Sequence, residues 1–261
     1  MTWWEGIILG VVQGLTEFLP VSSSGHLVVA EASLGLQTPG VFVEVTVHVA
    51  TLVAVAVVYW RRLGELLAGA GRRDPAAWAY IGLLALASVP AAVIGVLFQA
   101  WFESTFDSLA IVGVNFLVTG TFLWSTRAAR PGAHPAPSVR GAVCIGLAQA
   151  AAILPGISRS GATVTAGIWG GVEPVRAAEF SFLMAMPAIA GAAVLQLPEM
   201  AAGTAAVGSA PLALAFGAAL LSGIAAIRLL VRLLARGAFH RFAPYCWTVG
   251  VVTLAWVLVR A

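Results

Sequence analysis

The sequence predicts an all-α integral membrane protein with six transmembrane helices and two re-entrant helical hairpins in an inverted-topology repeat. Three observations support this prediction: the apolar composition, six apolar segments of membrane-spanning length, and two related polar runs that break two further apolar stretches. Hydrophobic residues make up 60% of the 261 residues and charged residues only 10%. A soluble domain carries about a quarter charged residues, so the composition excludes an ordinary soluble fold.

The charge pattern argues against nucleic acid as a partner. All the basic residues are Arg, the net charge is only +3, and the Arg residues fall in connections between apolar segments. The start of the chain lacks a basic region followed by a short apolar region and a cleavage site, so we expect no removable signal peptide. Cys144 and Cys246 lie in apolar stretches without metal or disulfide spacing. We expect both to be small buried residues.

Membrane spans are predicted from the length of the apolar segments. A complete span needs about 20 apolar residues. Two stretches, 6–36 and 141–172, are apolar but are broken midway by Pro, Ser and Gly, which leaves halves too short to cross. Non-helical backbone at membrane depth is tolerated only where protein or a water-filled cavity covers it, so we predict both as re-entrant hairpins. The six predicted spans are 41–60, 77–100, 108–126, 176–197, 211–234 and 243–259.

The two polar runs resemble each other, which predicts an internal repeat. Residues 13–26 read QGLTEFLPVSSSGH, and residues 149–163 read QAAAILPGISRSGAT. Three spans follow each hairpin, and because three is odd the second half is inverted. We predict a single membrane domain, 1–261, with a first repeat at 1–126 and a second at 141–261. Chance similarity of apolar segments is the alternative, but the polar positions match too. A shift of 136 superimposes Gly10 on Gly146, Gln13 on Gln149, Ser22 on Ser158, Ser24 on Ser160 and Gly25 on Gly161.

The distribution of Arg predicts the orientation, since cytoplasmic loops carry an excess of basic residues. The connections 101–107 and 198–210 carry only Glu103, Asp107 and Glu199. The first hairpin should therefore enter from outside and the second from inside. We expect a multi-pass protein of the inner (plasma) membrane whose site opens to the extracytoplasmic side. The expected cytoplasmic residues are Arg61, Arg62, Arg72, Arg73, Arg127, Arg130, Arg140, Arg228, Arg232, Arg236 and Arg241.

Both polar runs carry the residues of a known family. Residues 14–26 and 155–163 resemble the two signature motifs of the undecaprenyl-diphosphate phosphatase family of the BacA type, and residues 178–182 (AEFSF) resemble that family as well. The resemblance covers nearly the whole chain. It implies a membrane enzyme that removes the terminal phosphate of a C55 polyprenyl diphosphate, recycling the lipid carrier for cell-wall precursors and conferring bacitracin resistance when abundant. The family fold has six spans and two inverted re-entrant hairpins.

One residue departs from the family pattern. Many members carry a second Glu four residues before the signature Glu17, where this chain has Gln13. Both side chains lie on one helical face. Glu17 is expected to bind a divalent cation, Mg²⁺ or Ca²⁺, that bridges the diphosphate, or to orient His26; alternatively it only pairs with Arg159. Gln13 could hydrogen-bond a phosphate but brings no charge, which argues against a two-carboxylate metal clamp.

The serine run after Pro20 is expected to open the second half of the first hairpin. At least one of Ser22, Ser23 and Ser24 should cap that helix, and a helix start offers free N–H groups to the substrate anion. The resemblance implies that Ser23 is the nucleophile. His26 lies one helical turn after Ser23, a spacing that suits a base taking its proton. His26 could instead attack directly, or be held by a backbone carbonyl.

Arg159 is the sole cation of the second hairpin, and its planar fork suits bidentate contact with phosphate. Its catalytic role would be to stabilise the transferring group, while an ion pair with Glu17 is the alternative. Three hydroxyls beside it, those of Ser158, Ser160 and Thr163, are expected to bind substrate.

Four further ionisable residues and one small-residue run are less specific. Glu44 and His48 share a helix face and could form a second polar layer, a metal-ligand pair or structural hydrogen bonds. Glu179 and Arg176 are expected to form a local ion pair. The run 217–219 would allow close helix packing or a homodimer interface. The rival function is a flippase or transporter of a polyprenyl phosphate, because broken helices in an inverted repeat are also transporter architecture.

Overall fold

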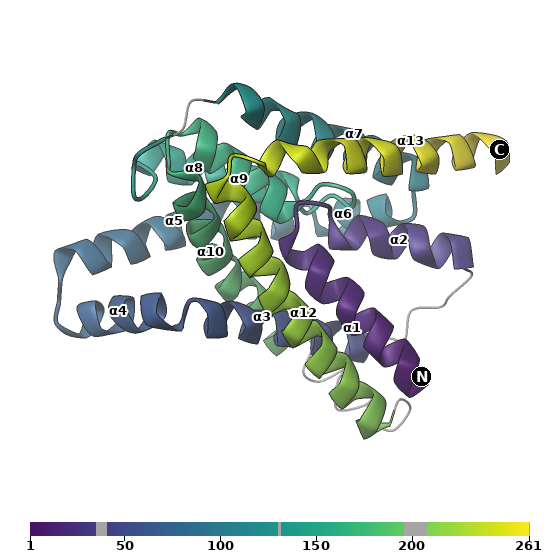
Figure 1. Ribbon diagram of the computed structural model, residues 1–261, viewed down its shortest axis with the longest axis horizontal. Coiled ribbons are helices and arrows are strands. Elements are labelled where there is room, and N and C mark those ends of the chain that lie inside the picture. The colour runs from purple at the N-terminus through teal and green to yellow at the C-terminus, as the bar shows by residue number, and fades with distance from the viewer. Residues whose placement is uncertain (35–40, 130–131, 196–207, 261) are drawn as a thin grey trace.

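The computed structural model describes residues 1–34, 41–129, 132–195 and 208–260. Apart from an isolated β-bridge between His134 and Val172, its regular elements are helical. Arg130, Glu199 and the ends of the predicted segments 6–36 and 176–197 lie outside these ranges. The helices (Figure 1) are α1 (Trp3–Phe18), α2 (Ser23–Leu34), α3 (Val41–Val58), α4 (Trp60–Gly71), α5 (Pro75–Leu97), α6 (Gln99–Phe106), α7 (Leu109–Ser125), α8 (Val139–Ala151), α9 (Arg159–Trp169), α10 (Pro174–Leu195), α12 (Ser209–Ala235) and α13 (Ala243–Arg260), with short 3₁₀ turns η1 (Thr126–Ala128) and η2 (Phe239–Phe242).

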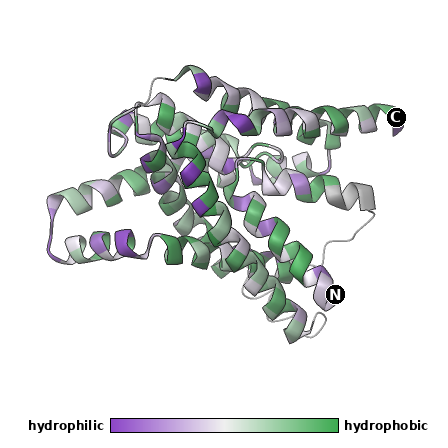
Figure 2. Cartoon of the chain, viewed as in Figure 1, coloured by the Kyte–Doolittle hydropathy of each residue, from purple (hydrophilic) through white to green (hydrophobic). Residues whose placement is uncertain are grey.

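Within the described ranges, four helical segments are long and apolar enough to cross a membrane: α5, α7 with η1, α12, and η2 with α13. The pair α3 and α4 passes the same test only when taken together, and its 75° bend is compatible with a broken span or a re-entrant loop. The chain is therefore a multi-pass membrane protein. Figure 2 shows hydrophobic residues along most of α12, whereas hydrophilic residues gather along α4 and near the centre of the molecule.

Both predicted hairpins consist of two helices separated by a short break. The first is α1 and α2, interrupted at residues 19–22, and the second is α8 and α9, interrupted at 152–158. The matched serines of the two breaks make the same local contacts. Ser22 Oγ accepts from Gly25 N (3.3 Å), and Ser158 Oγ accepts from Gly161 N (3.1 Å). Each helix start is thus capped by a serine hydroxyl.

The first helix of each hairpin packs closely on a long span. Helix α1 lies along α12, and α8 lies along α5 (Figure 1). A Cβ at Gly10 would collide with the backbone carbonyl of Ala215, and a Cβ at Gly146 would collide with that of Ala87. Small residues let helix backbones approach in this way without lipid between them. The two contacts hold the first helix of each hairpin against a long apolar helix.

Two expectations from the sequence need correction. The Arg-rich connection after the first span is not a simple loop, because residues 60–71 form helix α4, which turns sharply away from α3. Of the two cysteines, Cys246 is buried as expected, but Cys144 is exposed on the surface of α8. An apolar surface position is ordinary in a membrane protein, since lipid rather than water surrounds the spans.

Candidate active site

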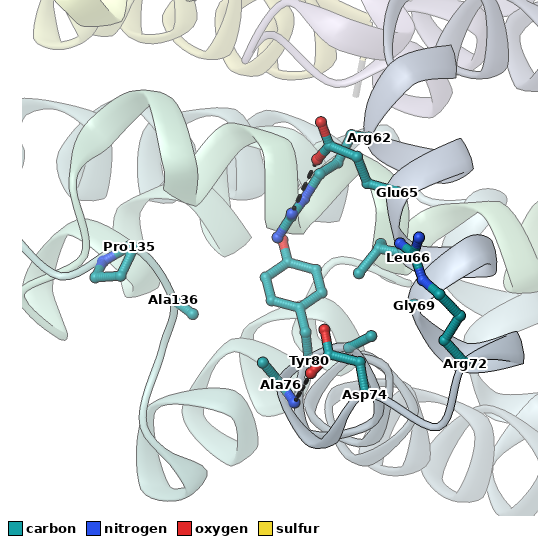
Figure 3. A pocket seen from close by; sticks show the side chains of 11 residues that line it. Arg62, Glu65, Leu66, Gly69, Arg72, Asp74, Ala76, Tyr80, Pro135 and Ala136 are labelled. Atoms are coloured by element: carbon teal, nitrogen blue, oxygen red, sulfur yellow. Dashed lines mark hydrogen bonds and ion pairs between the residues drawn. The ribbon is translucent and has the colours of Figure 1, made fainter.

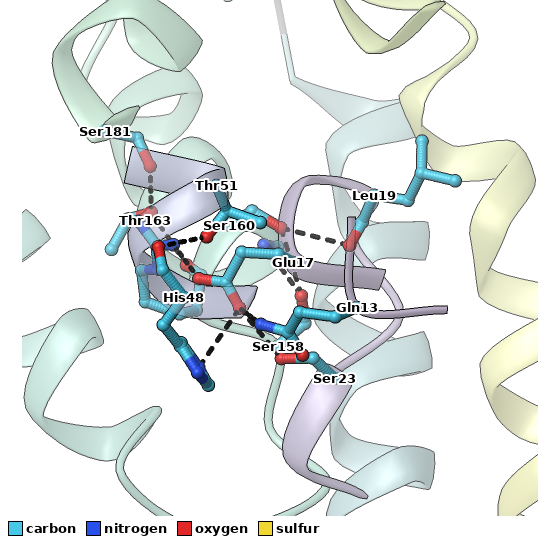
Figure 4. Close-up of polar contacts among 12 residues, drawn as sticks. Gln13, Glu17, Leu19, Ser23, His48, Thr51, Ser158, Ser160, Thr163 and Ser181 are labelled. Atoms are coloured by element: carbon cyan, nitrogen blue, oxygen red, sulfur yellow. Dashed lines mark hydrogen bonds and ion pairs between the residues drawn. The ribbon is translucent and has the colours of Figure 1, made fainter. Parts of the chain in front are cut away.

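The breaks of the two hairpins meet. Arg159 Nη2, at the start of α9, donates to Glu17 Oε1, at the end of α1, over 2.5 Å. Ser160 Oγ also donates to the carbonyl of Leu19 (3.2 Å), as Figure 4 shows. A pocket of about 90 Å³ lies between the two breaks. Its lining residues are Thr16, Glu17, Ser22, Ser23, Ser24, Ala152, Ile157, Ser158 and Arg159.

The Glu17 carboxylate is the centre of the polar contacts. Its Oε1 accepts from Arg159, while its Oε2 accepts from Gln13 Nε2 (3.1 Å) and from Ser23 Oγ (3.0 Å). His48 Nε2 lies 4.0 Å from the same oxygen. Only 9% of the Glu17 side chain is exposed, so these donors replace the water that a carboxylate would otherwise bind. Figure 4 shows the side chains converging on this group.

Ser23 and His26 do not make the hydrogen bond that their spacing favoured. Ser23 donates to Glu17 Oε2. The two ring nitrogens of His26 contact the carbonyl of Ser22 (Nδ1, 2.7 Å) and the hydroxyl of Tyr245 (Nε2, 2.6 Å). The backbone-carbonyl alternative for His26 is therefore the observed contact. The carboxylate, and not the imidazole, accepts the hydrogen bond of the Ser23 hydroxyl.

One donor nitrogen of the Arg159 guanidinium has no hydrogen-bond partner among the described residues. Its Nη2 pairs with Glu17, but Nη1 is buried and has no hydrogen-bond partner among the described residues. A buried guanidinium N–H without an acceptor costs free energy. An anionic oxygen in the adjoining pocket would satisfy this donor, and the fork would then bridge the carboxylate of Glu17 and the anion.

Two helix starts face the same pocket. Helix α2 begins at Ser23 and helix α9 begins at Arg159, and both residues line the pocket. A helix start carries unpaired N–H groups and the positive end of the helix dipole, which together favour an anion. The pocket also has the hydroxyls of Ser22, Ser24 and Ser158 in its walls. The arrangement suits a ligand with several negatively charged oxygens.

Two of the predicted substrate-binding hydroxyls lie outside the pocket lining. Ser160 is buried, and its hydroxyl donates to the carbonyl of Leu19 and contacts Ser158 Oγ (3.2 Å). Thr163 is fully buried, where its hydroxyl contacts the carbonyl of Arg159 (2.7 Å) and Ser181 Oγ (2.6 Å). Both residues brace the second break instead. The spacing of these hydroxyls in the sequence could not show which of them line the pocket and which lie behind its wall.

Helix α7 holds the second break in place from the side. Asn115 Nδ2 donates to the carbonyl of Pro155 (2.8 Å), and Thr119 Oγ1 donates to that of Gly156 (2.8 Å) and accepts from Ser158 N (3.1 Å). Gly156 has a φ of 92°, and a Cβ there would lie 2.5 Å from the carbonyl oxygen of Val112. Only glycine fits both the backbone conformation and the space. Sequence reasoning missed these α7 residues, whose signal was a polar side chain inside an apolar span.

The expected Glu44–His48 layer joins the site through one member only. His48 Nδ1 contacts the carbonyl of Glu44 (2.8 Å), and its other nitrogen faces Glu17. Glu44 itself is exposed. His48 is therefore an outer member of the Glu17 cluster, and its backbone contact matches the structural alternative.

A second charged cluster surrounds Glu179. The expected pair with Arg176 is present (Nη1 to Oε2, 3.0 Å), but Arg62 Nε lies equally close to Oε1 (3.0 Å). The Arg62 guanidinium also lies over the ring of Tyr80 (4.6 Å). A cavity of about 400 Å³ opens beside it between α4 and α5 (Figure 3), and it shares no lining residue with the pocket at the breaks. Arg72, Glu65 and Asp74 give its walls charges of both signs, which favours no single class of ion.

The donor set tests whether a divalent cation fits at the breaks. Within the described residues, no three His, Cys, Asp or Glu side chains gather as a metal cage. Glu17 is the one carboxylate in the pocket wall, and Ser23 beside it offers a further oxygen, whereas Gln13 presents its amide nitrogen to Glu17. Mg²⁺ is commonly held by one or two carboxylates together with substrate phosphates. The residues therefore fit a cation shared with a bound phosphate group, not an ion held by protein alone.

Comparison with known proteins gives a consistent result. Residues 6–252 match the family model described as bacitracin resistance protein BacA. A protein of Desulforapulum autotrophicum named undecaprenyl-diphosphatase is 40% identical over 271 residues, covering 97% of this chain and 98% of its own length. The proteins of that name from Parabacteroides distasonis and Salinibacter ruber are 38% and 42% identical, and this chain and theirs are covered by 99% or more. The chain belongs to the BacA family.

Proposed function

We propose that this protein hydrolyses undecaprenyl diphosphate to undecaprenyl monophosphate and inorganic phosphate, and so returns the lipid carrier to cell-wall synthesis. The proposal follows the activity that its relatives are named for, over nearly the whole chain. The observation that carries it is the pairing, in one pocket, of an unsatisfied Arg159 donor with a Ser23 hydroxyl bonded to a carboxylate. An anion-binding group and an activated hydroxyl are what phosphoryl transfer requires.

Binding would begin with the diphosphate oxygens. Arg159 Nη1 donates to the terminal phosphate while Nη2 keeps its bond to Glu17, so the guanidinium fork is held in one orientation. The N–H groups at the starts of α2 and α9 add further donors. The prenyl chain would lie among the apolar helices, since the surfaces of α12 and α13 expose large apolar side chains such as Leu221 and Val252.

Ser23 is the proposed nucleophile. Its Oγ attacks the terminal phosphorus, the Oγ–P bond forms, and the bridging P–O bond breaks so that undecaprenyl monophosphate leaves with the electron pair. Glu17 Oε2, which already accepts the Ser23 hydrogen bond, receives the proton. Water then attacks the phosphoserine, the Oγ–P bond breaks, and inorganic phosphate departs while Ser23 regains a proton. His26 is less suited to direct attack because both of its ring nitrogens are engaged.

We also propose a divalent cation, Mg²⁺ or Ca²⁺, held by Glu17 together with the substrate oxygens. When bound, such an ion would neutralise charge on the diphosphate. Gln13 would keep the carboxylate oriented through its Nε2 contact. Replacing Glu17 by Gln should remove both the activity and its response to added cation. A Glu17→Gln variant that keeps the metal titration curve of the wild type would exclude Glu17 as a ligand.

The proposed topology is six spans with two re-entrant hairpins, in two inverted repeats at 1–126 and 141–261. Two findings support it: the matched serine caps of the two breaks, and the reciprocal packing of α1 on α12 and of α8 on α5. The Arg distribution supports a pocket that opens to the extracytoplasmic side of the inner membrane. Gly217 on α12 has open space around it among the described residues, which leaves this surface for lipid or for a second copy.

A flippase or transporter of polyprenyl phosphate is the other function that broken helices in a repeat would serve. The hydrolase is favoured because transport gives no reason for a serine hydroxyl bonded to a buried carboxylate. Phosphate release from C55 diphosphate by the purified protein in detergent tests the choice. Detergent micelles have no two sides, so release means catalysis. A folded wild-type protein that releases no phosphate with Mg²⁺ or Ca²⁺ would overturn the proposed function.

A further inference from the structure

Tyr245 reaches the first hairpin from the far end of the sequence. It lies near the start of α13, and its hydroxyl is 2.6 Å from His26 Nε2. The two rings are nearly parallel, with an interplanar angle of 6° and centroids 5.6 Å apart. The next residue, Cys246, contacts the carbonyl of Pro20 through its Sγ (3.5 Å). Two consecutive residues of α13 therefore contact the first hairpin, Cys246 at its break and Tyr245 at the start of α2.

The contacts of His26 determine how its ring is protonated when neutral. Nδ1 lies 2.7 Å from the carbonyl of Ser22, and a carbonyl only accepts hydrogen bonds. Nδ1 must therefore carry the proton, which leaves a lone pair on Nε2. The Tyr245 O–H then donates to Nε2. Tyr245, His26 and Ser22 form a chain in which each hydrogen bond has a defined direction.

This chain of hydrogen bonds ends at Ser22, which has a strained backbone and directly precedes the proposed nucleophile Ser23. Ser22 is buried and has a φ of 66°, in the left-handed region that a serine rarely adopts. Its carbonyl accepts from both His26 Nδ1 and His26 N (3.2 Å), and its side chain caps Gly25. Phe116 packs edge-on against the imidazole (5.1 Å between centroids). The ring is thus fixed between α7, α13 and the turn that precedes Ser23.

We propose that Tyr245 is a positioning residue of the active site, which acts through His26 to hold the Ser22 turn and so to aim Ser23 Oγ at the phosphate. The inference rests on the proposed phosphatase function. If the hydroxyl is lost, His26 keeps its ring but loses the contact that orients Nε2, and the carbonyl of Ser22 loses a fixed donor. A misplacement of about 1 Å at a reacting atom can lower the rate by roughly 10²-fold.

The test compares Tyr245→Phe with a control on the same helix. Tyr245→Phe removes one hydroxyl and keeps the ring. Trp247→Phe removes another aromatic donor of α13, whose Nε1 contacts Thr121 Oγ1 (3.4 Å) on α7 and not His26. We expect kcat for C55 diphosphate to fall by about tenfold in Tyr245→Phe with KM within twofold, and to stay near the wild-type value in Trp247→Phe. A Tyr245→Phe kcat within twofold of wild type would overturn the proposal.

A double-mutant cycle tests whether the effect passes through His26. His26→Asn keeps a donor near the position of Nδ1 but has no group at the position of Nε2. Tyr245→Phe should then lower kcat no further in the His26→Asn protein, and additive losses would refute action through His26. If the wild-type protein is inactive, the proposed function fails. The same double-mutant cycle, measured as thermal unfolding midpoints, then tests the Tyr245–His26 contact alone. Additive shifts of the midpoint would show that the two residues are not coupled and would overturn the proposal.

Discussion

Glu17 accepts hydrogen bonds from three side chains through two oxygen atoms, so its possible roles compete. As an ion-pair partner it uses Oε1 for Arg159, and as a proton acceptor it uses Oε2 for Ser23. A cation would have to displace the Gln13 amide or share Oε2 with it. The geometry therefore favours the carboxylate over the imidazole as the proposed acceptor of the Ser23 proton, whereas His26 contacts the carbonyl of Ser22 in the neighbouring turn.

Replacing Ser23 by Ala should nearly abolish turnover while substrate still binds. The variant loses the attacking oxygen but keeps Arg159, Glu17 and both helix starts. We expect kcat to fall by at least about 10²-fold, the lower bound for losing a proton-transfer group alone. The measurement is phosphate release in detergent, with Ser104→Ala at an exposed position of α6 as the control. A Ser23→Ala protein within about tenfold of wild type would reduce Ser23 to a helix-start residue.

Replacing Arg159 by Lys should cost about 10²-fold in kcat, although the charge is kept. A guanidinium bonds Glu17 with one nitrogen and leaves a second, rigidly placed donor for phosphate, whereas an ammonium is a single, more strongly hydrated point charge. The change in KM should be smaller, because Coulomb attraction remains. Steady-state kinetics of Arg159→Lys and Arg159→Ala, with matched thermal stability, distinguish the cases. Near wild-type turnover in Arg159→Lys would mean that the residue only balances the charge of Glu17.

Sequence reasoning identified the ionisable residues of the site because each is costly in an apolar stretch. Glu17 and Arg159 stand out for that reason, and their contact follows from the two matched breaks. The partner of His26 was not predictable, since three-residue spacing favoured Ser23 and Tyr245 lies 219 positions away. Aromatic residues near span ends are common as interfacial anchors. Nothing local to Tyr245 distinguishes it from one of these.

At the level of elements, glycine spacing decides how the hairpins sit. Gly6, Gly10 and Gly14 lie on one face of α1 and are buried against α12. This packing holds the end of α1, and with it Glu17, beside the second break. The sequence contained that spacing, but it did not identify the partner helix. Many apolar helices carry small residues, so the choice of α12 depends on the whole bundle.

Replacing Gly10 by Ala should therefore destabilise the protein, unlike the same change at Gly217. A Cβ at Gly10 would collide with the carbonyl of Ala215, whereas a Cβ at Gly217 meets no atom within 4 Å. We expect Gly10→Ala to cost about 1–3 kcal/mol, as overpacking usually does. Gly217→Ala should be neutral or stabilise by up to about 1 kcal/mol, because Ala favours helix. Thermal unfolding in detergent compares them, and equal midpoints would mean that α1 and α12 do not pack this closely.

For the whole molecule, the sequence predicted the all-helical membrane fold, and the two breaks follow from Pro, Gly and Ser in apolar stretches. It did not predict the 75° bend between α3 and α4. Arg61, Arg62 and Glu65 mark residues 60–71 as polar, which is compatible with a loop or an amphipathic helix. The pairing of Arg62 with Glu179 of α10 holds α4 where it is. Such a contact between distant segments is not visible in local periodicity.

The proposed topology places two of the connections between spans on opposite sides of the membrane. Gly71, at the end of α4, should face the cytoplasm because the connection is rich in Arg, and Ser104 on α6 should face outward because its connection carries only acidic charges. Both positions are exposed. Single cysteines there, in a background with Cys144→Ser and Cys246→Ala, should react differently with a membrane-impermeant thiol reagent on intact cells. Ser104→Cys should label directly, and Gly71→Cys only after the membrane is permeabilised. If only Gly71→Cys is labelled in intact cells, the proposed orientation is reversed and the site faces the cytoplasm. If both positions are labelled in intact cells, the chain does not cross the membrane an odd number of times between residues 71 and 104, and the proposed topology is wrong.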